Sequence, residues 1–233
     1  MGRGEGGLCG GNGENVKYGR RVDLLGPEVG NKFVEMDEFM KEYSDLSSGA
    51  WGKPEETKPM MLWLRKDPEY LVFRAEVEID LPLETIAEFM LDDQFIGRTD
   101  PRSKNLKKLK ELSSQCDIVQ FSMEAKWPVS ARDMVVYRNK YYSDKDTFNI
   151  LNFKAFDTEH PPSKDIMRID IKIQGRTLTR ISSNKTKIVN TSMMNPKMSG
   201  VPIFVLRGKL KDGAIATHQF MLAVEVEAKK LSK

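Results

Sequence analysis

Few residues in this chain have the types and spacing that catalysis requires. Its two histidines are His160, in a proline-rich stretch, and His218, beside the apolar stripe of the C-terminal segment. Neither has a Cys or Ser nucleophile within a motif, so a structural role is favoured for both. The two cysteines, Cys9 and Cys116, lie far from the histidines and lack metal-ligand spacing. The sequence therefore predicts no catalytic residue, no cofactor and no metal site, and no glycine-rich phosphate loop follows a strand.

The charged residues of greatest interest lie between Trp127 and Tyr142. Alternation from Met134 onward is typical of a strand, and it puts Arg138 on the same face as Met134 and Val136. In one interpretation, Arg132-Asp133 forms structural ion pairs and Arg138 reaches water at the end of the strand. In the other, the strand is the wall of a cavity, where Arg138 holds an anionic or hydroxylated ligand.

Length and composition exclude several classes of protein. The 233 residues fit one domain of about 200 residues plus an appendage. Lys and Arg total 37 against 34 Asp and Glu, a net charge of +3, which gives a nucleic-acid-binding role no electrostatic support. Two cysteines argue against a disulfide framework and favour a reducing compartment. The sequence shows no long apolar run and no signal peptide, so we expect a soluble, cytoplasmic protein.

The N-terminal part combines a glycine-rich tail with a helix. Residues 1–15 contain seven glycines, which indicates a flexible segment that we extend over residues 1–30. Apolar residues at three- and four-residue intervals then predict a helix over Asn31–Leu46, with Asn31 as its cap. A further short helix is expected around Leu83–Leu91.

Alternating segments predict a sheet between these helices and the C-terminus. Met60–Arg65 and Tyr70–Ile79 read as a hairpin with one buried face. Six more strands without intervening helices predict a strongly curved antiparallel meander: Leu106–Leu112, Ile118–Lys126, Asp133–Tyr142, Thr147–Phe156, Ile166–Ile181 and Lys185–Asn195.

A long amphipathic helix is predicted to close the chain. Pro202 suits its first turn, and an apolar stripe that includes Met221 runs along it. A curved sheet closed by such a helix leaves an interior that the helix fills or leaves open. The thirteen methionines suit an adaptable apolar wall, and they equally suit an ordinary core.

Five local motifs, in their order and spacing, resemble those of the START (StAR-related lipid transfer) domain over about residues 50–230. The most specific is the loop that leads into the predicted strand Asp133–Tyr142, Trp127-Pro128-Val129-Ser130-Ala131-Arg132-Asp133. The others are Leu91-Asp92-Asp93 with Arg98-Thr99-Asp100-Pro101, His160-Pro161-Pro162 with Met167-Arg168-Ile169, Gly175-Arg176-Thr177-Leu178, and Asn195-Pro196 with Gly200-Val201-Pro202.

The resemblance implies an α+β helix-grip fold over residues 31–233, with a curved antiparallel sheet of about nine strands wrapped on the C-terminal helix around an apolar tunnel. It implies a monomeric, non-enzymatic protein that holds one lipid, phospholipid or sterol-like, and exchanges it at membranes. Its partners would be the lipid and, transiently, a membrane surface, with no nucleic acid. The alternatives are a helix-grip enzyme of the cyclase or hydrolase kind and an interaction module that is insensitive to ligand.

The resemblance also assigns residues to roles. The polar contact with the ligand would be Arg138, and the other lipid-binding residues would be Met134, Val136, Phe121, Arg98, Asp100 and Met221. The tunnel mouth that contacts membranes would consist of Trp127, Pro128, Val129, Ile203, Phe204 and Arg207; the alternative is that this wedge only plugs the mouth. A structural role would fall to Arg132, Asp133 and Arg168.

Departures from the family pattern bear on the ligand. Thr99 and Asn195 replace a tryptophan and an aspartate of two motifs. The aligned positions of an aromatic choline cage are Phe121, Met134 and Lys172, of which only one is aromatic, so choline is disfavoured. Alternation of the neighbouring isoleucines puts Lys172 toward solvent, although a one-residue slip of the strand would reverse its direction.

Overall fold

The computed structural model describes residues 19, 25–57, 60–99, 106–123, 130–155, 159–162, 164–195, 197 and 210–231. No helix among these residues is long and apolar enough to cross a membrane. The helices are α1 (Pro27–Ser44), the short η2 (Leu46–Ser48), α2 (Leu83–Leu91), α3 (Asp93–Thr99) and α5 (Leu210–Leu231). The strands are β1 (Glu55–Thr57), β2 (Met60–Arg65), β3 (Leu71–Ile79), β4 (Lys107–Ser113), β5 (Cys116–Met123), β6 (Arg132–Asp144), β7 (Thr147–Lys154), β8 (Met167–Arg168), β9 (Asp170–Ser182) and β10 (Lys185–Asn195).

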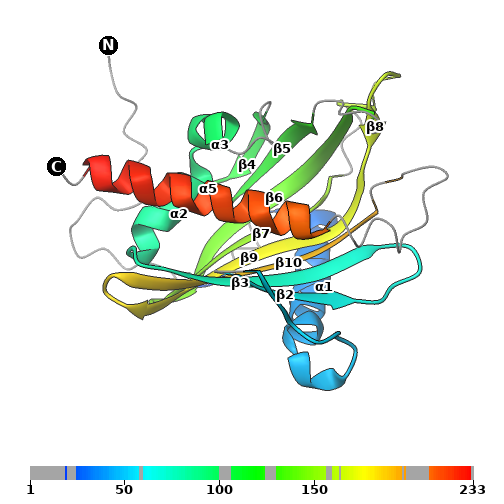
Figure 1. Ribbon diagram of the computed structural model, residues 1–233. Helices are drawn as coiled ribbons and strands as arrows, with labels where there is room; N and C mark the ends of the chain where they lie inside the picture. Colours follow the sequence, from blue (N-terminus) through cyan, green and yellow to red (C-terminus); the bar gives the residue numbers. More distant parts are fainter. Residues whose placement is uncertain are drawn as a thin grey trace, which may run out of the picture.

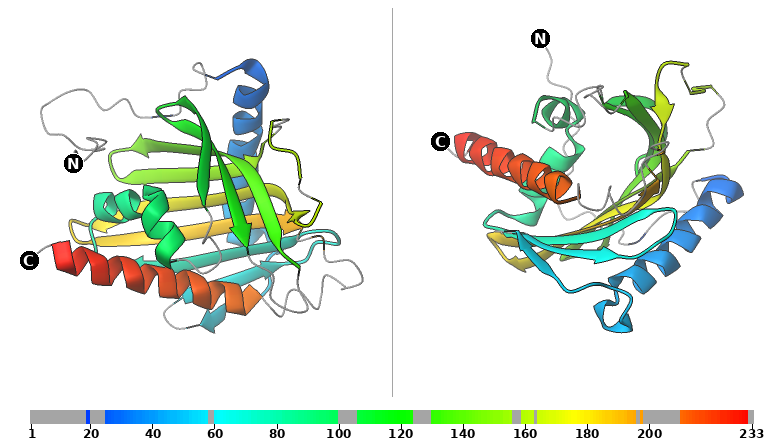
Figure 2. Two further views of the ribbon diagram at one scale, coloured as in Figure 1. Left: turned by 90° about the horizontal axis from the view of Figure 1, so that it is seen from above. Right: turned by 45° about the vertical axis from the view of Figure 1, so that its right-hand side comes forward.

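One curved sheet contains all these strands. Its order is β1-β2-β3-β10-β9-β7-β6-β5-β4, and neighbours along it are antiparallel. The short β8 lies off this path and pairs in parallel with β6. Figure 2 shows that the sheet is strongly curved, as predicted for the antiparallel meander. The last strand, β10, pairs with β3 of the first hairpin. The first and last parts of the strand series therefore lie next to each other within the sheet.

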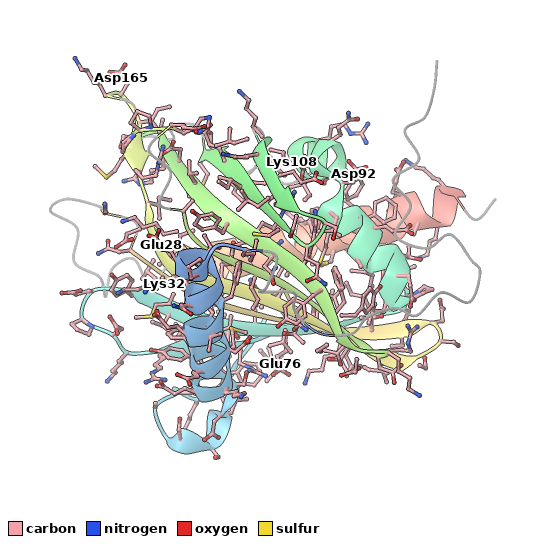
Figure 3. All side chains as sticks on the ribbon, turned by 180° about the vertical axis from the view of Figure 1, so that it is seen from behind. Glu28, Lys32, Glu76, Asp92, Lys108 and Asp165 are labelled. Carbon is pink, nitrogen blue, oxygen red and sulfur yellow. The ribbon has the colours of Figure 1, made fainter. Side chains whose placement is uncertain are left out.

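Helices cover both faces of the sheet. On the concave face lie α2, α3 and α5, and α5 crosses it as the long helix of Figure 1. On the convex face lies α1, with Glu28 and Lys32 near its start (Figure 3). The side chains of α5 are described only for residues 219–230, where Phe220, Met221 and Val224 are buried. They join the main apolar cluster of the concave face, whose sheet residues include Met60, Leu62, Ala75, Val77, Phe148, Ile150, Leu178 and Ile188.

A second apolar cluster holds α1 on the convex face. Phe33 is fully buried, and its ring meets that of Phe153 edge to face with centroids 4.7 Å apart. Gly175 of β9 permits the close approach, since a Cβ there would lie 2.7 Å from Cε of Met40. The helix begins at Pro27, so the predicted start at Asn31 with Asn31 as cap is wrong. Proline at the first helical position is favourable there, and apolar contacts reach upstream to Val29.

A β-bulge near the start of β9 reverses the face to which odd- and even-numbered side chains point. Met194 pairs with Ile171 and Met193 with Ile173, so Lys172 is an extra residue between the two pairs. Ile171 then packs with Val136 on the inner side, whereas Ile173 packs in the cluster under α1. Lys172 is exposed, as predicted, but the reason is the bulge, since Ile171 and Ile173 do not share a face. Its ammonium lies 5.6 Å from the ring centroid of Tyr70.

One helix differs from the sequence prediction, and the start of another cannot be compared with it. The helix α3 was not predicted, although it begins directly after Asp92, whose carboxylate accepts hydrogen bonds from the backbone amides of Gln94 and Phe95, each at 2.9 Å. The predicted start of the last helix at Pro202 lies outside the described residues.

We predict that Phe33→Ala destabilises the protein by about 3–5 kcal/mol, because it leaves a cavity between α1 and the sheet. The measurement is the free energy of unfolding in urea. The matched control is Val34→Ala on the neighbouring residue, whose side chain is 51% exposed; it should cost less than about 0.5 kcal/mol. Equal effects of the two substitutions would show that α1 does not contribute to the core.

Candidate functional site

Arg138 lies at the centre of a buried ion cluster on the concave face. Its Nε and Nη2 each donate to Asp117 at 2.8 Å, and its Nη1 donates to Asp93 at 2.6 Å. Lys140 adds a contact with Asp117 at 3.2 Å. Arg138 is only 4% exposed in the middle of β6, so the interpretation of a wet strand end is wrong. Two cations and two carboxylates meet here, which makes the cluster neutral.

The cluster stabilises the charged forms of Asp117 and Arg138. Burial alone raises the pKa of Asp117, but the hydrogen bond from Arg138 and the charges of Arg138 and Lys140 outweigh it and lower this pKa below its usual range. Burial likewise opposes the charge on Arg138, and its two carboxylate partners raise its pKa above the ordinary value. Asp117 and Arg138 are therefore both ionised near neutral pH.

The two consecutive aspartates at the start of α3 have different roles. Asp92 caps the helix through its bonds to the first amides (Figure 3). Asp93, the first helical residue, points its carboxylate to Arg138. Phe95, one turn on, packs against Phe89 and against Phe220 of α5. The cluster thus ties α3 to β5 and β6, and the aromatic contacts tie α3 to α5.

The cluster continues as a line of polar side chains across the sheet. Arg138 is the cross-strand partner of Asp117 on one side and of Asn152 on the other. Asn152 pairs with Gln174, and Gln174 pairs with Ser192. Directly opposite residues point to the same face of a sheet, so these five residues form one polar row on the concave wall. Within it, the Asn152 amide donates to Oε1 of Gln174 at 3.2 Å.

The predicted apolar ligand residues fall into two clusters. Phe121 and Met134 are directly opposed on β5 and β6, and they pack together with Val136 beside Ile169 and Ile171. Met221 of α5 belongs instead to the main cluster of the concave face. Arg98 is exposed on α3, and Asp100 lies outside the described residues. So do the mouth residues Trp127, Pro128, Val129, Ile203, Phe204 and Arg207.

The structure does not assemble the three aligned positions of a choline cage. Phe121 and Met134 share the inner cluster, whereas Lys172 is exposed beside Tyr70. One aromatic ring remains at the inner position. A cage for a quaternary ammonium uses several ring faces around the cation, so these three residues do not form one.

Asp133 and Arg168 form a second ion pair, away from the first. Nε and Nη2 of Arg168 donate to the Asp133 carboxylate at 2.6 and 2.8 Å, and Gln120 donates to it at 2.9 Å. Arg168 also donates to the carbonyl of His160 at 3.3 Å, which fixes the loop before β8. Arg132, by contrast, donates to the carbonyl of Ser130 at 2.6 Å. This arrangement connects β6 to β8 and to the preceding loop.

Sequence reasoning missed the partners of Arg138. Asp117 follows Cys116 at the start of a strand, where an acid before an apolar run gives no sign of full burial. Asp93 was noted only as part of a motif. A signal was present, since a buried arginine in a strand requires a carboxylate at the opposing position or on a covering helix.

Comparison with known proteins places the chain in a family. The model of the START domain family matches residues 32–218. The chain belongs to this family. A search of the curated proteins finds no match.

Solved structures give the fold of this START domain. Human STARD10 is 18% identical, with a TM-score of 0.74 over 85% of this chain and 84% of that chain. Human StAR-related lipid transfer protein 5 is 13% identical, with a TM-score of 0.75 over 88% and 98% of the two chains. The lipid transfer and protein localization domain of human StarD13 is 15% identical, with a TM-score of 0.61 over 82% and 93%. This START domain therefore has the helix-grip α+β fold, with its sheet wrapped on the C-terminal helix.

Within this START domain, we predict that Arg138→Met destabilises the fold by about 3–5 kcal/mol, because it leaves the buried carboxylate of Asp117 without its main partner. The double variant Arg138→Met/Asp117→Leu should regain most of that loss, since an apolar pair avoids the buried charge. Urea unfolding of both single variants and the double variant gives the coupling free energy. Additive effects would contradict the mutual dependence of the two side chains.

Proposed function

We propose that this START domain holds one lipid molecule between the concave face of the sheet and the helices α3 and α5, and exchanges it at membranes. The observation that carries the proposal is the concave wall itself. It combines apolar side chains from β5, β6 and β9 with one polar row that has Arg138 near its end. Membership of the START family supports it, as does the likeness in fold to human StAR-related lipid transfer protein 5 and to the lipid transfer and protein localization domain of human StarD13.

The energetics of a lipid explain why such a wall is needed. A two-chain lipid exposes about 30 methylene groups, and moving it through water unshielded costs roughly 24 kcal/mol at about 0.8 kcal/mol each. A carrier must replace water around the chains with apolar side chains such as those of Phe121, Met134 and Val136. It must also give the polar end of the lipid a partner, and in our proposal the guanidinium of Arg138 contributes to it.

We propose that the mouth residues Trp127, Pro128, Val129, Ile203, Phe204 and Arg207 contact the membrane during exchange. The sequence supports this role, because large apolar side chains next to cations suit the interface of an anionic membrane. The protein would then act as a cytoplasmic monomer that visits membranes.

The first prediction of this proposal is that the purified protein carries one lipid molecule per chain. Native mass spectrometry of the protein, followed by extraction and identification of the bound compound, measures it. A soluble protein of similar size from the same cells is the control for adventitious lipid. An empty protein that takes up no lipid from vesicles would favour the interaction module, and conversion of a small molecule would favour the enzyme.

A second prediction concerns exchange. Trp127→Asp should slow lipid transfer between vesicles about tenfold, because a carboxylate opposes insertion at the membrane interface, while lipid binding in solution stays unchanged. Trp127→Phe, which keeps an apolar ring, should transfer at nearly the original rate. Transfer of a fluorescent lipid between donor and acceptor vesicles measures both variants. An unchanged rate for Trp127→Asp would reject the docking role.

A further inference from the structure

The convex face has a pocket of about 370 Å³ between α1 and the strands β7 and β9, on the side of the sheet opposite the concave wall. We call it the α1 pocket; it is lined by α1, by residues 153–154 of β7 and by residues 170–173 of β9. In the described part of the chain, β7 and β9 pair only as far as Asn152 and Gln174. Beyond that pair β9 forms its bulge at Lys172, and α1 covers the gap between the two strands without filling it.

The floor of the α1 pocket is the edge of the apolar cluster under α1. Met36, Phe153 and Ile173 are buried there, and Phe39 is partly exposed. The ring of Phe39 stacks on that of Tyr43 with centroids 3.8 Å apart, which holds it in place. The volume is at the small end of the range for ligand pockets, about 300–1,000 Å³. The pocket therefore suits a molecule with a body of one or two rings, and it is too small for a two-chain lipid.

The rim on the strand side carries two ammonium groups and one carboxylate. Nζ of Lys154 lies 3.6 Å from the Asp170 carboxylate, and the hydroxyl of Tyr70 donates to the same carboxylate at 3.3 Å. The ammonium of Lys172 lies over the Tyr70 ring, and no described carboxylate pairs with it. Lys154 and Lys172 are both exposed. This part of the rim thus has one unbalanced positive charge that water and ligands can reach.

The rim on the helix side is balanced. Lys32 and Glu35, one turn apart on α1, form an ion pair at 2.7 Å. The described lining residues therefore include three lysines and two carboxylates, so a ligand with one negative charge would complete the balance. A lysine ammonium binds an anion as a point charge and does not need the planar geometry that arginine selects. A carboxylate or another singly charged anionic group fits this requirement.

We propose that the α1 pocket is a second ligand site, which binds a small amphipathic anion. Its anionic group lies between Lys154 and Lys172, and its rings cover Phe39 and the Met36 side chain. The charge of the two lysines selects the anion, and the apolar floor selects the rings. The site is independent of the lipid role of the concave face, because its residues face the other side of the sheet.

The two faces are close enough that a test must resolve them. Ile171 lines the α1 pocket and also packs with Val136 and Ile169 in the inner cluster. A compound that entered the inner cluster could therefore be mistaken for one in the α1 pocket if only total binding were measured. Two methionines distinguish the faces, because Met36 lines the α1 pocket and Met134 packs in the inner cluster.

The experiment follows methionine methyl signals by NMR. The full-length protein is isotope-labelled at its methionine methyl groups, and Met36→Leu and Met134→Leu assign the two signals. Naphthoate is titrated into the protein, and the neutral naphthamide, which has the same rings, is its matched control. The variants are Lys172→Gln and Lys154→Gln, on two different strands. Lys110→Gln is the control, since it removes an exposed lysine from the edge strand β4.

We expect naphthoate to shift the Met36 signal, to leave the Met134 signal in place, and to bind about tenfold more tightly than naphthamide, which lacks the charge. Lys172→Gln and Lys154→Gln should each weaken naphthoate about fivefold, the effect of one exposed ion pair, and Lys110→Gln should keep the original affinity. The methyl spectrum of each variant also shows whether it is folded.

Three results would overturn the proposal. They are an unmoved Met36 signal, equal affinities for naphthoate and naphthamide, and a loss in Lys110→Gln that equals the loss in the two pocket variants. A shift of Met134 without a shift of Met36 would locate the compound on the concave face and would overturn it as well. None of these results would bear on whether the concave face holds a lipid, which native mass spectrometry tests separately.

Discussion

A guanidinium in the wall of a sheet constrains everything around it. Burial of the Arg138 guanidinium requires carboxylate partners. Asp117 on a neighbouring strand and Asp93 on a covering helix provide them. The position of α3 is therefore coupled to the centre of β6. Buried ion pairs seldom stabilise a fold more than well-packed apolar residues of the same volume would. What the cluster does determine is position, because it holds α3 against β5 and β6.

The convex face has a separate apolar core, which lies under α1. Residues of β6, β7 and β9 alternate between the inner wall and the cluster under α1, so the same strands belong to two cores. Phe153 supports α1 from a strand whose neighbouring Asn152 faces inward. With apolar contacts on both sides, these strands form the firm part of the molecule.

Periodicity was sufficient for most of the fold. The predicted strands from Leu106 to Asn195 are present within a few residues, because alternation and short polar turns are local properties. The exception is Ile166–Ile181, which is divided into β8 and β9 and whose first part pairs in parallel with β6. The start of α1 was placed four residues late, since its first turn rests on a proline and on contacts with the distant sheet. The helix α3 is not predicted from the sequence, because its seven residues are too few to show the helical period of apolar positions.

The candidate site was predictable in part only. The strand pattern put Arg138 on the same face as Met134 and Val136, but it could not say that Asp117 would lie opposite. That pairing depends on the register across the long connection between β5 and β6, which no local pattern sets. The polar row is likewise a property of register across five strands. Its members come from scattered segments, and each alone reads as an ordinary polar residue.

The bulge at Lys172 shows how much one residue can decide. Before it, the odd-numbered isoleucines of the segment face inward; after it, Ile173 faces the opposite core. The extra residue reverses the alternation of side chains, so that even-numbered instead of odd-numbered positions of β9 point inward. Gln174 and Arg176, even-numbered positions, are thereby brought to the inner wall that Ile171 occupied two pairs earlier. The contribution of β9 to the polar row thus depends on a single inserted residue.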